Sequence, residues 1–322
     1  MGARRNFAIL GVAGYIAPRH LDAIAAAGHR LVAAADPCDS VGLLDRYSPD
    51  VEFFRQSEEL ESFLHQRRRG SAAGRVDYVS ICSPTDLHEA HLRLALGAGA
   101  DALCEKPLVV DARSLDSLEE LERVTGRRIF TVLQLRLHPT LLALRQRIAD
   151  GAAAATAEVE LTYVTPRGRW YEVSWKGSEE RSGGIVLNIG IHCLDLLIWL
   201  FGAVRRSEVH LREERRAAGF LELERATVRW FLSIAREDLP ATAGLAGMTA
   251  HRTMAVDGSE IDFSAGFGDL HRKVYEATLA GAGAGIADAR PALELAHAIR
   301  SAPLTSAATA EHPLIRRREV AR

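Results

Sequence analysis

Short apolar runs alternate with amphipathic stretches along the first 130 residues of the chain. This rhythm is typical of βαβ units, in which a helix connects two strands of a parallel sheet. The pattern predicts strands at residues 7–13, 31–35, 78–82, 102–104 and 129–135, and helices at 21–27, 87–96 and 113–124. We therefore expect an α/β domain over residues 1–130, with its sheet buried between helices.

The pattern changes in the second half of the chain, where strand signals follow one another more directly. Strands are predicted at residues 158–164, 208–212, 220–223 and 226–233, and as a hairpin at 254–257 and 260–263. An apolar helix at 185–201 interrupts this series, residues 151–155 predict a helix end and a loop, and helices are predicted at 270–279 and 291–301. Residues 131–322 should thus form an α+β domain around a large, open, mostly antiparallel sheet.

Composition adds limits on size and on partners. The 322 residues include 48% hydrophobic and 25% charged side chains, which is ordinary for a folded globular protein. This length accommodates about two domains, each able to bury its own core. The 42 acidic and 40 basic residues leave a net charge of −2. Because a nucleic-acid-binding protein needs a basic face, this balance argues against nucleic acid as a partner.

The chain has four cysteines that are widely separated and include no C-x-x-C pair: Cys38, Cys82, Cys104 and Cys193. This spacing matches neither a zinc site nor a disulfide framework, so we expect no metal and a cytoplasmic location. The longest apolar stretch, residues 185–201, contains three polar side chains and makes a poor membrane span. Residues 1–18 superficially resemble a signal peptide, but the glycines that interrupt their apolar run favour a strand entering a turn.

A glycine-rich turn follows the first predicted strand. It reads Gly11-Val12-Ala13-Gly14-Tyr15-Ile16-Ala17, one residue longer than the usual dinucleotide fingerprint and with alanine in last place. Gly11 permits a tight turn, Gly14 lets the backbone approach a pyrophosphate, and the small Ala17 allows close packing of helix on strand. We interpret the turn as part of a Rossmann dinucleotide-binding domain.

Asp36 strengthens this interpretation, because it lies about 20 residues after Gly14 at the end of the next predicted strand. A carboxylate in this place accepts hydrogen bonds from the ribose diol of adenosine and repels a 2′-phosphate. The residues after it, Pro37-Cys38, supply no arginine for such a phosphate. NAD is therefore favoured over NADP as the cofactor. The plainer alternative is an aspartate that only ends a strand in a turn.

Lysine occurs at only three positions, Lys106, Lys176 and Lys273, although the chain has 40 basic residues. A chain so rich in arginine is expected to keep lysine where an amine must release a proton. Lys106 lies in Glu105-Lys106-Pro107 at a predicted strand end, where ligands bind in sheets of this class. It could polarise a substrate hydroxyl or accept its proton. The alternative is a surface Glu-Lys pair of little consequence.

Two further segments carry polar residues at predicted element ends. Residues 82–88, Cys-Ser-Pro-Thr-Asp-Leu-His, follow a strand, and His88 either caps a cofactor or lies on a solvated helix face. In the apolar helix, Asn188, His192 and Asp195 are spaced to share one face. A lone buried histidine is usually structural, but three polar groups in an apolar helix after Gly183-Gly184 favour a site, because each must be satisfied.

These motifs together resemble the glucose-fructose oxidoreductase/inositol dehydrogenase/MocA family over essentially the whole chain. The resemblance rests on the glycine turn, Asp36, S-P-x-x-L-H at residues 83–88, E-K-P at 105–107 and G-G-x-x-x-N-x-G-x-H-x-x-D at 183–195. Within the family, the chain is most similar to bacterial UDP-N-acetyl-glucosaminuronate 3-dehydrogenases. Six stretches carry this narrower match: A-G-Y-I-A-P-R-H at 13–20, D-Y-V-S-I-C-S-P at 77–84, L-Q-L-R-L-H-P at 133–139, R-G-R-W-Y at 167–171, S-W-K-G at 174–177 and V-R-W-F-L-S at 228–233.

The resemblance implies a Rossmann domain that binds NAD and a second domain whose open sheet forms a dimer or tetramer. The NAD contacts it implies are Gly11, Ala13, Gly14, Tyr15, Ile16, Asp36, Ser83, Thr85, His88, Glu105, Lys106 and Gln134. Lys106 and His192 fall on the catalytic positions of the family. The chain departs from the family pattern at Asn188, where many members have aspartate, and at Thr85, where asparagine is common.

The activity implied is the oxidation of the 3-hydroxyl of a UDP-linked N-acetyl-glucosaminuronic acid to the 3-keto sugar, in the synthesis of surface polysaccharide (O-antigen) sugars. One of Lys106 and His192 takes the hydroxyl proton while the other polarises the oxygen, and both assignments stay open. Beside these two, the substrate contacts expected are Arg167 on the carboxylate, with Arg136, Gln134, Tyr163 and Asn188 as lesser candidates. Two alternatives are a dehydrogenase of a free sugar or polyol, and a non-enzymatic NAD-binding sensor.

Overall fold

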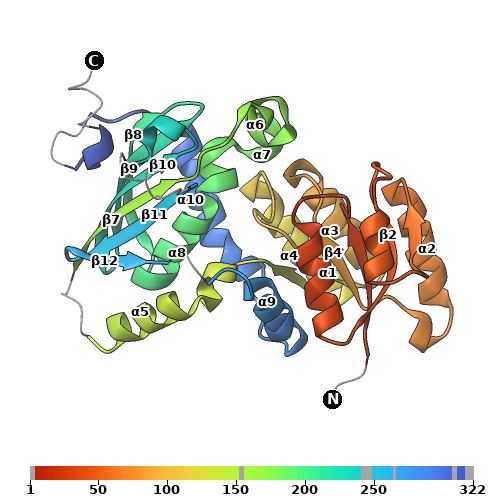
Figure 1. Cartoon of the computed structure of the whole chain (residues 1–322). Helices are drawn as coiled ribbons and strands as arrows, with labels where there is room; N and C mark the ends of the chain where they lie inside the picture. Colours follow the sequence, from red (N-terminus) through yellow and green to blue (C-terminus); the bar gives the residue numbers. More distant parts are fainter. Residues whose placement is uncertain (1–3, 152–155, 241–248, 264–265, 307–309, 316–322) are drawn as a thin grey trace. The chain divides into compact units, whose positions relative to one another are not determined.

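The computed structural model of the protein describes residues 4–151, 156–240, 249–263, 266–306 and 310–315 (Figure 1). The chain divides into two compact units. The first comprises Met1–Gln134 and Gly268–Arg290, and the second comprises Leu135–Phe267 and Pro291–Arg322. The expected boundary after residue 130 lies close to this division, but the return of residues 268–290 to the first unit has no counterpart in the sequence pattern.

The first unit is built on a six-stranded sheet in the order β3-β2-β1-β4-β5-β6, in which every pairing is parallel. Its strands are β1 (Asn6–Leu10), β2 (Arg30–Ala35), β3 (Glu52–Phe54), β4 (Tyr78–Ile81), β5 (Asp101–Cys104) and β6 (Ile129–Thr131). The central strands are almost completely buried because helices cover both faces of the sheet. The α/β class predicted for this part of the chain is confirmed.

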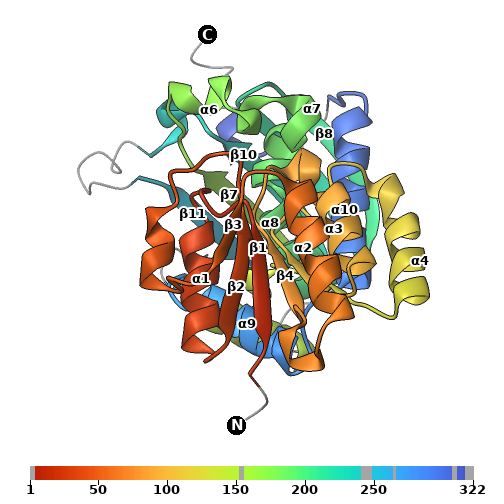
Figure 2. The same ribbon diagram turned by 90° about the vertical axis from the view of Figure 1, so that its right-hand side faces the viewer.

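Helices lie on both sides of this sheet (Figure 2). On one face, α1 (Ala17–Ala26) packs against α9 (Leu270–Leu279), the helix supplied by the returning segment. On the other face lie α2 (Ser57–Arg69), α3 (His88–Gly97) and α4 (Leu115–Thr125). The strand order reverses direction between β1 and β4, and ligands of doubly wound sheets bind at the carboxyl ends of the strands at such a point.

The second unit has a six-stranded sheet in the order β12-β11-β7-β10-β9-β8. Its strands are β7 (Ala157–Val164), β8 (Val204–Arg212), β9 (Arg216–Leu223), β10 (Ala226–Ser233), β11 (His251–Val256) and β12 (Ser259–Asp262). Only the β7–β10 pairing among these is parallel, so the sheet is mixed and mostly antiparallel, as expected. Its helices are α5 (Pro139–Ala149), α6 (Arg169–Val173), α7 (Glu179–Ser182), α8 (Ile191–Phe201) and most of α10 (Ile286–Ser301), with the π-helical turn η7 (Ile185–Ile189) before α8.

The helical layer of the second unit covers one face of its sheet. A Cβ atom added at Gly190, between η7 and α8, would come within 2.6 Å of Leu232 on β10. On the opposite face, ion pairs join neighbouring strands, with Arg229 on β10 3.6 Å from Glu160 on β7. The face with Arg229 thus carries charged side chains, and at its other end Phe231, Val164 and Ala218 pack with Ile315 in a buried apolar cluster.

Several predicted elements need correction. The apolar segment 185–201 is not one regular helix, because η7 is wound as a π-helix and the helix before Gly190 is bent by 42° from α8. The strand predicted at 7–13 ends at Leu10, where Gly11 turns the chain with a φ of +81°. Five helices and strands, β3, α2, α5, α6 and α7, were not predicted. Helix α2 is mostly polar and buries only Leu60 and Leu64, which explains why its apolar pattern was missed.

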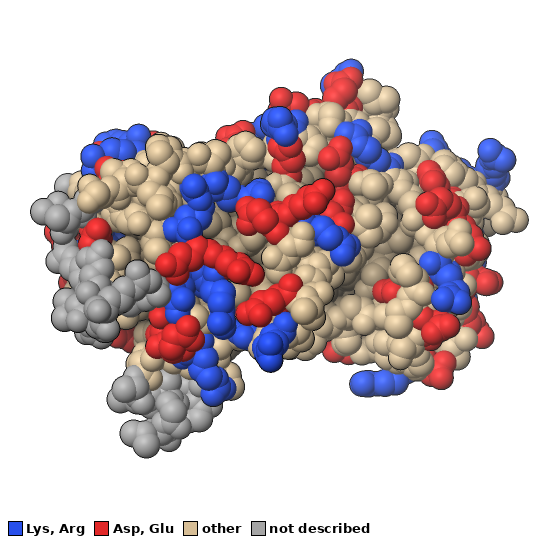
Figure 3. Space-filling model, turned by 90° about the horizontal axis from the view of Figure 1, so that it is seen from above, with Lys and Arg blue, Asp and Glu red and all other residues tan. Residues whose placement is uncertain are grey.

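Three further observations concern possible membrane spans, surface charge and the helix end predicted near residue 151. No single helix among the described residues is long and apolar enough to cross a membrane, and the one bent pair of that composition joins Glu179–Ile189 to α8. Acidic and basic side chains are intermixed on the face drawn in Figure 3. Gly151 follows α5 with a φ of +73°, while the alanines after it lie outside the described residues.

Candidate functional site

The glycine turn between β1 and α1 lies against the end of β4. A Cβ atom at Gly11 would stand 2.5 Å from the Ser83 nitrogen, and one at Gly14 would stand 3.0 Å from the Gly11 oxygen. Both glycines are therefore needed by the protein's own backbone, because any side chain at Gly11 would collide with the β4 loop. Tyr15 at the tip of the turn is 91% exposed, and the first turn of α1 carries no acidic side chain that would repel an anion.

Asp36 at the end of β2 is joined to this turn. Its carboxylate accepts hydrogen bonds from the Ala13 nitrogen at 3.0 Å and from the Cys38 nitrogen at 2.9 Å. The side chain is only partly buried. Asp36 thus holds the glycine turn as well as the turn that follows its own strand.

The segment after β4 is fixed from within by two histidines. Ser83 Oγ lies 2.8 Å from His91 Nδ1, and Thr85 is buried. His88 is fully buried rather than on a solvated helix face, with Nδ1 2.8 Å from the Pro107 oxygen and Nε2 3.0 Å from the Ser83 oxygen. His88 therefore ties the β4 loop to the β5 loop that carries Lys106.

Glu105, which follows β5, is the centre of a buried polar cluster. His20 Nε2 of α1 and His271 Nε2 of α9 each lie 3.0 Å from its Oε1 atom. Its Oε2 atom accepts from the Lys106 nitrogen at 3.1 Å. Tyr275 Oη lies 2.8 Å from His20 Nδ1 and 2.7 Å from Ser80 Oγ, which extends the cluster across the sheet.

Burial and hydrogen bonding set the charges in this cluster. Burial disfavours a charged Glu105, but the hydrogen bonds from His20 and His271 outweigh it and hold the pKa of Glu105 well below its usual value. Burial lowers the pKa of His20, which keeps that ring neutral, and raises the pKa of Tyr275 well above its usual value. The cluster therefore holds one buried carboxylate, solvated only by protein donors.

The atoms of His20, Glu105 and His271 lie within 4.8 Å of one another, a spacing that a metal ion could use. Both ring nitrogens approach the same carboxylate oxygen at hydrogen-bond distance. We interpret the group as a hydrogen-bonded cluster for that reason, and the expectation of no metal stays a prediction.

Lys106 and Gln134 complete the candidates of the first unit. Lys106 is half-buried directly after β5, and the Lys106–Pro107 peptide bond is cis. Gln134 stands at the start of the turn η5 (Gln134–Leu137), and its buried Oε1 atom has no hydrogen-bond partner among the described residues. An orphaned buried acceptor of this kind suits a ligand with an N–H donor, such as a carboxamide.

The candidates of the second unit lie around the junction of η7 and α8. Asn188 is buried in η7, where its Nδ2 atom donates to Tyr171 Oη at 2.9 Å. His192 is half-buried in the first turn of α8. Asp195, one turn further, forms a two-fold ion pair with Arg136, at 2.7 and 3.1 Å. Asn188 and Asp195, which were expected on one stripe, thus have different partners, and only Asn188 lies in the π-turn while His192 and Asp195 share α8.

Two other residues that were predicted to contact the substrate, Tyr163 and Arg167, lie at the end of β7. Arg167 is anchored through Nη1 to the Thr165 side chain at 2.8 Å and to the Pro166 oxygen at 3.1 Å. Tyr163 is buried, with the Arg252 guanidinium 5.2 Å from its ring centre, and burial raises the pKa of Tyr163 to about 12. Both side chains are held in fixed positions, whereas the guanidinium of Arg136 is already engaged by Asp195.

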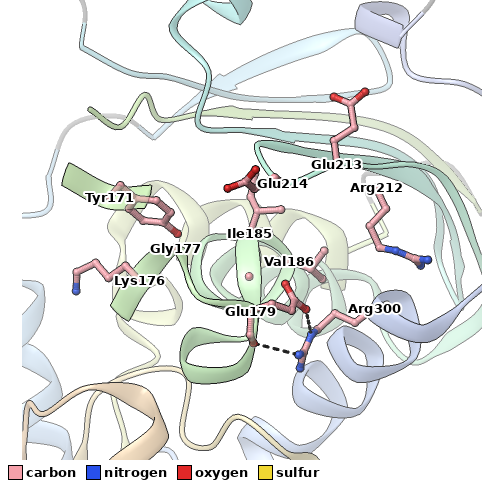
Figure 4. Close-up of a pocket in the computed structure, with 11 residues that line it drawn as sticks. Tyr171, Lys176, Gly177, Glu179, Ile185, Val186, Arg212, Glu213, Glu214 and Arg300 are labelled. Atoms are coloured by element: carbon pink, nitrogen blue, oxygen red, sulfur yellow. Dashed lines mark hydrogen bonds and ion pairs between the residues drawn. The ribbon is translucent and has the colours of Figure 1, made fainter. Parts of the chain in front are cut away.

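A pocket of about 240 Å³ lies within the second unit beside these residues (Figure 4). Tyr171, Lys176 and Ile185 contribute to its wall, so the partner of Asn188 also lines the pocket. Glu179 and Arg300 pair with each other at 2.7 Å across the wall. The remaining lining residues are Gly177, Gly184, Val186, Arg212, Glu213 and Glu214.

Some residues of these clusters were missed by the sequence analysis, namely His20, Ser80, His91, Tyr171, His271 and Tyr275. His271 and Tyr275 are four residues apart on the buried side of α9, and this polar pair on an apolar face is the one local signal that could have marked them. The fold alone brings His271 to Glu105, more than 160 residues earlier, and Tyr275 to His20.

Comparison with known protein families shows to which family the chain belongs. The family model described as an oxidoreductase family with an NAD-binding Rossmann fold matches residues 5–133, and the GFO/IDH/MocA C-terminal domain model matches residues 141–238. The chain belongs to the GFO/IDH/MocA family. The first matched range contains the glycine turn, Asp36 and Lys106, and the second contains Asn188 and His192.

Solved members of the GFO/IDH/MocA family resemble the whole chain. The WlbA (WbpB) dehydrogenase from Thermus thermophilus, crystallised with NAD and alpha-ketoglutarate, is 50% identical, with 96% of this chain and 99% of that chain covered and a TM-score of 0.92. The same dehydrogenase crystallised with NAD and UDP-GlcNAcA gives a TM-score of 0.91 at the same identity and coverage. The WlbA dehydrogenase from Bordetella pertussis is 19% identical with a TM-score of 0.76, which shows the common fold.

Curated members of the GFO/IDH/MocA family match a smaller part of this chain. Inositol 2-dehydrogenase from Rhizobium meliloti is 31% identical over 202 residues, which are 61% of this chain and 55% of that protein. D-glucoside 3-dehydrogenase from Escherichia coli is 28% identical over 139 residues, or 42% of this chain and 39% of that protein. The matches therefore span about half the length of these relatives or less.

Proposed function

We propose that this GFO/IDH/MocA member oxidises the 3-hydroxyl of UDP-N-acetyl-glucosaminuronic acid to the 3-keto sugar, with NAD as hydride acceptor. The observation that supports this most directly is the 50% identity, over 96% of the chain, to a dehydrogenase crystallised with NAD and UDP-GlcNAcA. The product would serve the synthesis of surface polysaccharide (O-antigen) sugars. All four cysteines are free, in keeping with the reaction taking place in the cytoplasm.

The first unit is proposed to bind NAD. The glycine turn with Gly11, Ala13, Gly14, Tyr15 and Ile16 would hold the pyrophosphate beside α1, and Asp36 would accept from the adenosine ribose. The remaining contacts are assigned to Ser83, Thr85, His88, Glu105, Lys106 and Gln134. The orphaned Oε1 atom of Gln134 supports this, because the carboxamide of nicotinamide offers the N–H donor that this atom lacks. Bound NAD supplies the acceptor for the hydride.

Lys106 and His192 are proposed to act on the substrate hydroxyl. The O–H proton passes to His192 as general base, the C3 hydrogen leaves with its electron pair, and a C=O bond replaces the C–O single bond. Lys106 would polarise the same oxygen while negative charge develops on it. The reverse assignment, with Lys106 as base, is nearly as well supported by the residues.

The second unit is proposed to bind the sugar. Arg167 is the best candidate for the substrate carboxylate, because contacts with Thr165 and Pro166 fix its guanidinium at the end of β7. Tyr163 and Asn188 are proposed as further contacts. Arg136 is the weakest, since its guanidinium is engaged by Asp195.

A homo-oligomer formed through the open sheet face is also proposed. On this face Arg206 of β8 lies 3.3 Å from Glu208 and 3.6 Å from Glu222, beside the pair of Arg229 and Glu160. A second copy would meet the same alternating charges, which a two-fold arrangement can match. Light scattering coupled to gel filtration tests this directly, and a monomer mass would contradict it.

A second candidate is a dehydrogenase of a free sugar or polyol, which the 31% identity to inositol 2-dehydrogenase favours. Such an enzyme would have no use for a nucleotide pocket. Calorimetric titration with UDP alone separates the two functions. We expect detectable binding for the proposed function, and no detectable affinity for UDP would contradict it.

Turnover tests the proposed reaction and its residues together. Wild type, Lys106→Ala and His192→Ala are compared with NAD and UDP-N-acetyl-glucosaminuronic acid by absorbance at 340 nm and by mass spectrometry of the sugar. Parallel assays contain alpha-ketoglutarate, because the Thermus relative was crystallised with it and its reduction would consume NADH. Each variant should lose roughly 100-fold or more of the rate. Unchanged rates in both would remove the site assignment, and no turnover by wild type would favour the NAD-binding sensor.

A further inference from the structure

Three buried histidines surround the turn that carries Lys106. They come from three different helices, His20 from α1, His88 from α3 and His271 from α9, and each is at most 5% exposed. His20 and His271 contact the residue before Lys106, and His88 contacts the residue after it. The backbone of the proposed catalytic lysine is therefore fixed on both sides by side chains far away in the sequence.

The hydrogen bonds of Glu105 fix which ring atoms carry protons. An ionised carboxylate only accepts, so His20 Nε2 and His271 Nε2 must both donate to Oε1. A neutral His20 then has a bare Nδ1 atom, which accepts the Tyr275 hydroxyl proton. The Tyr275 oxygen in turn accepts from Ser80. A single assignment of protons therefore satisfies every hydrogen bond in the series from Ser80 through Tyr275 and His20 to Glu105.

Glu105 also contacts the backbone of Lys106 directly. Its second oxygen, Oε2, accepts from the backbone nitrogen of Lys106 at 3.1 Å. A carboxylate held by two donors on one oxygen has little freedom to rotate, so its other oxygen has a fixed position for the Lys106 nitrogen.

His88 fixes the other side of the turn. Both of its contacts are carbonyl oxygens, and a neutral ring has a single N–H to offer. Nδ1 lies 2.8 Å from the Pro107 oxygen and Nε2 lies 3.0 Å from the Ser83 oxygen, so the ring is within hydrogen-bond distance of both carbonyls. The Pro107 carbonyl is thereby attached to α3.

We propose that His20, His88 and His271 are positioning residues for Lys106, and that they act through Glu105 and Pro107 to hold it in the geometry that polarises or deprotonates the substrate hydroxyl. This inference rests on the proposed role of Lys106. It assigns a function to the returning helix α9, which supplies His271 and Tyr275 to the turn that carries Lys106. A displacement of about 1 Å at a reacting group costs up to about 100-fold in rate, so such residues matter without touching the substrate.

The test uses His271→Leu, which removes one donor from Glu105, and His271→Gln, whose amide places an N–H close to the position of Nε2. His312→Gln is the matched control, because His312 is a buried histidine of the second unit that bonds to Thr162. Tyr275→Phe is a milder variant, which removes only the hydroxyl that donates to His20.

Lys106 can be observed directly because the chain has three lysines. Reductive methylation with ¹³C-formaldehyde gives one methyl resonance set for each lysine, assigned with Lys176→Arg and Lys273→Arg. In His271→Leu we expect the Lys106 resonance to move further than that of Lys176, which lies in the second unit. The shift should be smaller in Tyr275→Phe, and it should be largely reversed in His271→Gln and absent in His312→Gln.

Kinetics supply the second readout. In His271→Leu, kcat should fall roughly tenfold or more, whereas KM and the Kd for NAD, measured by fluorescence titration, change much less. His271→Gln should recover most of the kcat. If His271→Leu does not fold, the comparison of Tyr275→Phe with wild type decides the matter by the same two readouts.

An unmoved Lys106 resonance in both His271→Leu and Tyr275→Phe would overturn the proposal, as would a loss of NAD affinity equal to the loss of kcat. The resonance experiment needs no substrate. It therefore separates this inference from the proposed function, which fails instead if wild type shows no turnover of the UDP-sugar while the Lys106 resonance still responds.

Discussion

The candidate residues of the two units are placed by different kinds of structure. In the first unit they follow parallel strands, with Asp36 after β2, Ser83 after β4 and Lys106 after β5. In the second unit Asn188 and His192 stand on either side of a break, where the π-turn η7 meets α8 at Gly190. The first arrangement follows from sheet topology, whereas the second depends on a local irregularity of one helical segment.

The two units also stabilise buried charge in different ways. The carboxylate of Glu105 accepts hydrogen bonds from several donors, which lie on α1, on α9 and in the turn after β5. Around α8, the guanidinium of Arg136 pairs with the carboxylate of Asp195, and these side chains are 17% and 3% exposed. Replacing Asp195 leaves the mostly buried guanidinium of Arg136 without that carboxylate, whereas replacing one donor of Glu105 leaves the carboxylate its other donors. The pair of Arg136 and Asp195 should therefore be the more sensitive of the two to a single replacement.

Asp195→Ala is expected to have the largest effect on stability. It leaves the guanidinium of Arg136 mostly buried without its carboxylate, at a cost of about 3–5 kcal/mol in the free energy of unfolding. Urea unfolding followed by circular dichroism measures this. The control is Glu120→Ala, which removes the exposed partner of Arg123 and should leave the midpoint nearly unchanged. Equal urea midpoints for the two variants would contradict the expected sensitivity of the pair of Arg136 and Asp195.

Asn188→Leu is expected to have an intermediate effect, on activity. It removes the amide that donates to Tyr171 while keeping a similar volume. Tyr171→Phe removes the same bond from the other partner. If Asn188 contacts the substrate as proposed, kcat/KM should fall roughly ten- to 100-fold in Asn188→Leu and much less in Tyr171→Phe. Identical losses would show that Asn188 only holds η7 in place, and would contradict its role in substrate binding.

Acid sensitivity should give the smallest effect. Burial lowers the pKa of His312 in the second unit from 6.5 to about 3. Above pH 6.5 the ring is neutral in both states, but below it the unfolded chain binds a proton that the folded chain does not. Stability is therefore lost as the pH falls from 6.5 towards 3, by about 1 kcal/mol between pH 6.5 and 5.5.

His312→Gln removes this proton uptake, so its stability should depend less steeply on pH than that of wild type. Urea unfolding at pH 6.5 and 5.5 measures both slopes. His91, with a pKa lowered to about 4, remains in both proteins and cancels from the difference. Parallel slopes would contradict the assignment of acid sensitivity to His312.

The contrast between the units explains what could be predicted from the sequence. The strand ends that carry Asp36 and Lys106 were predictable because strands of a parallel sheet are short apolar runs with clear ends. The break at Gly190 was not, because η7 and α8 form one continuous apolar run in which a π-turn leaves no signal. The cluster around Glu105 was also beyond local pattern, since His20 and His271 meet only through the pairing of α1 with α9.

The return of residues 268–290 to the first unit has a consequence for synthesis of the protein. Domains commonly fold as they leave the ribosome, starting from the N-terminus. Here the first sheet emerges early, but the helix that buries Tyr275 against α1 is translated only after most of the second unit. The side of α1 that α9 covers in the folded protein therefore stays exposed on the nascent chain until residues 270–279 have been translated.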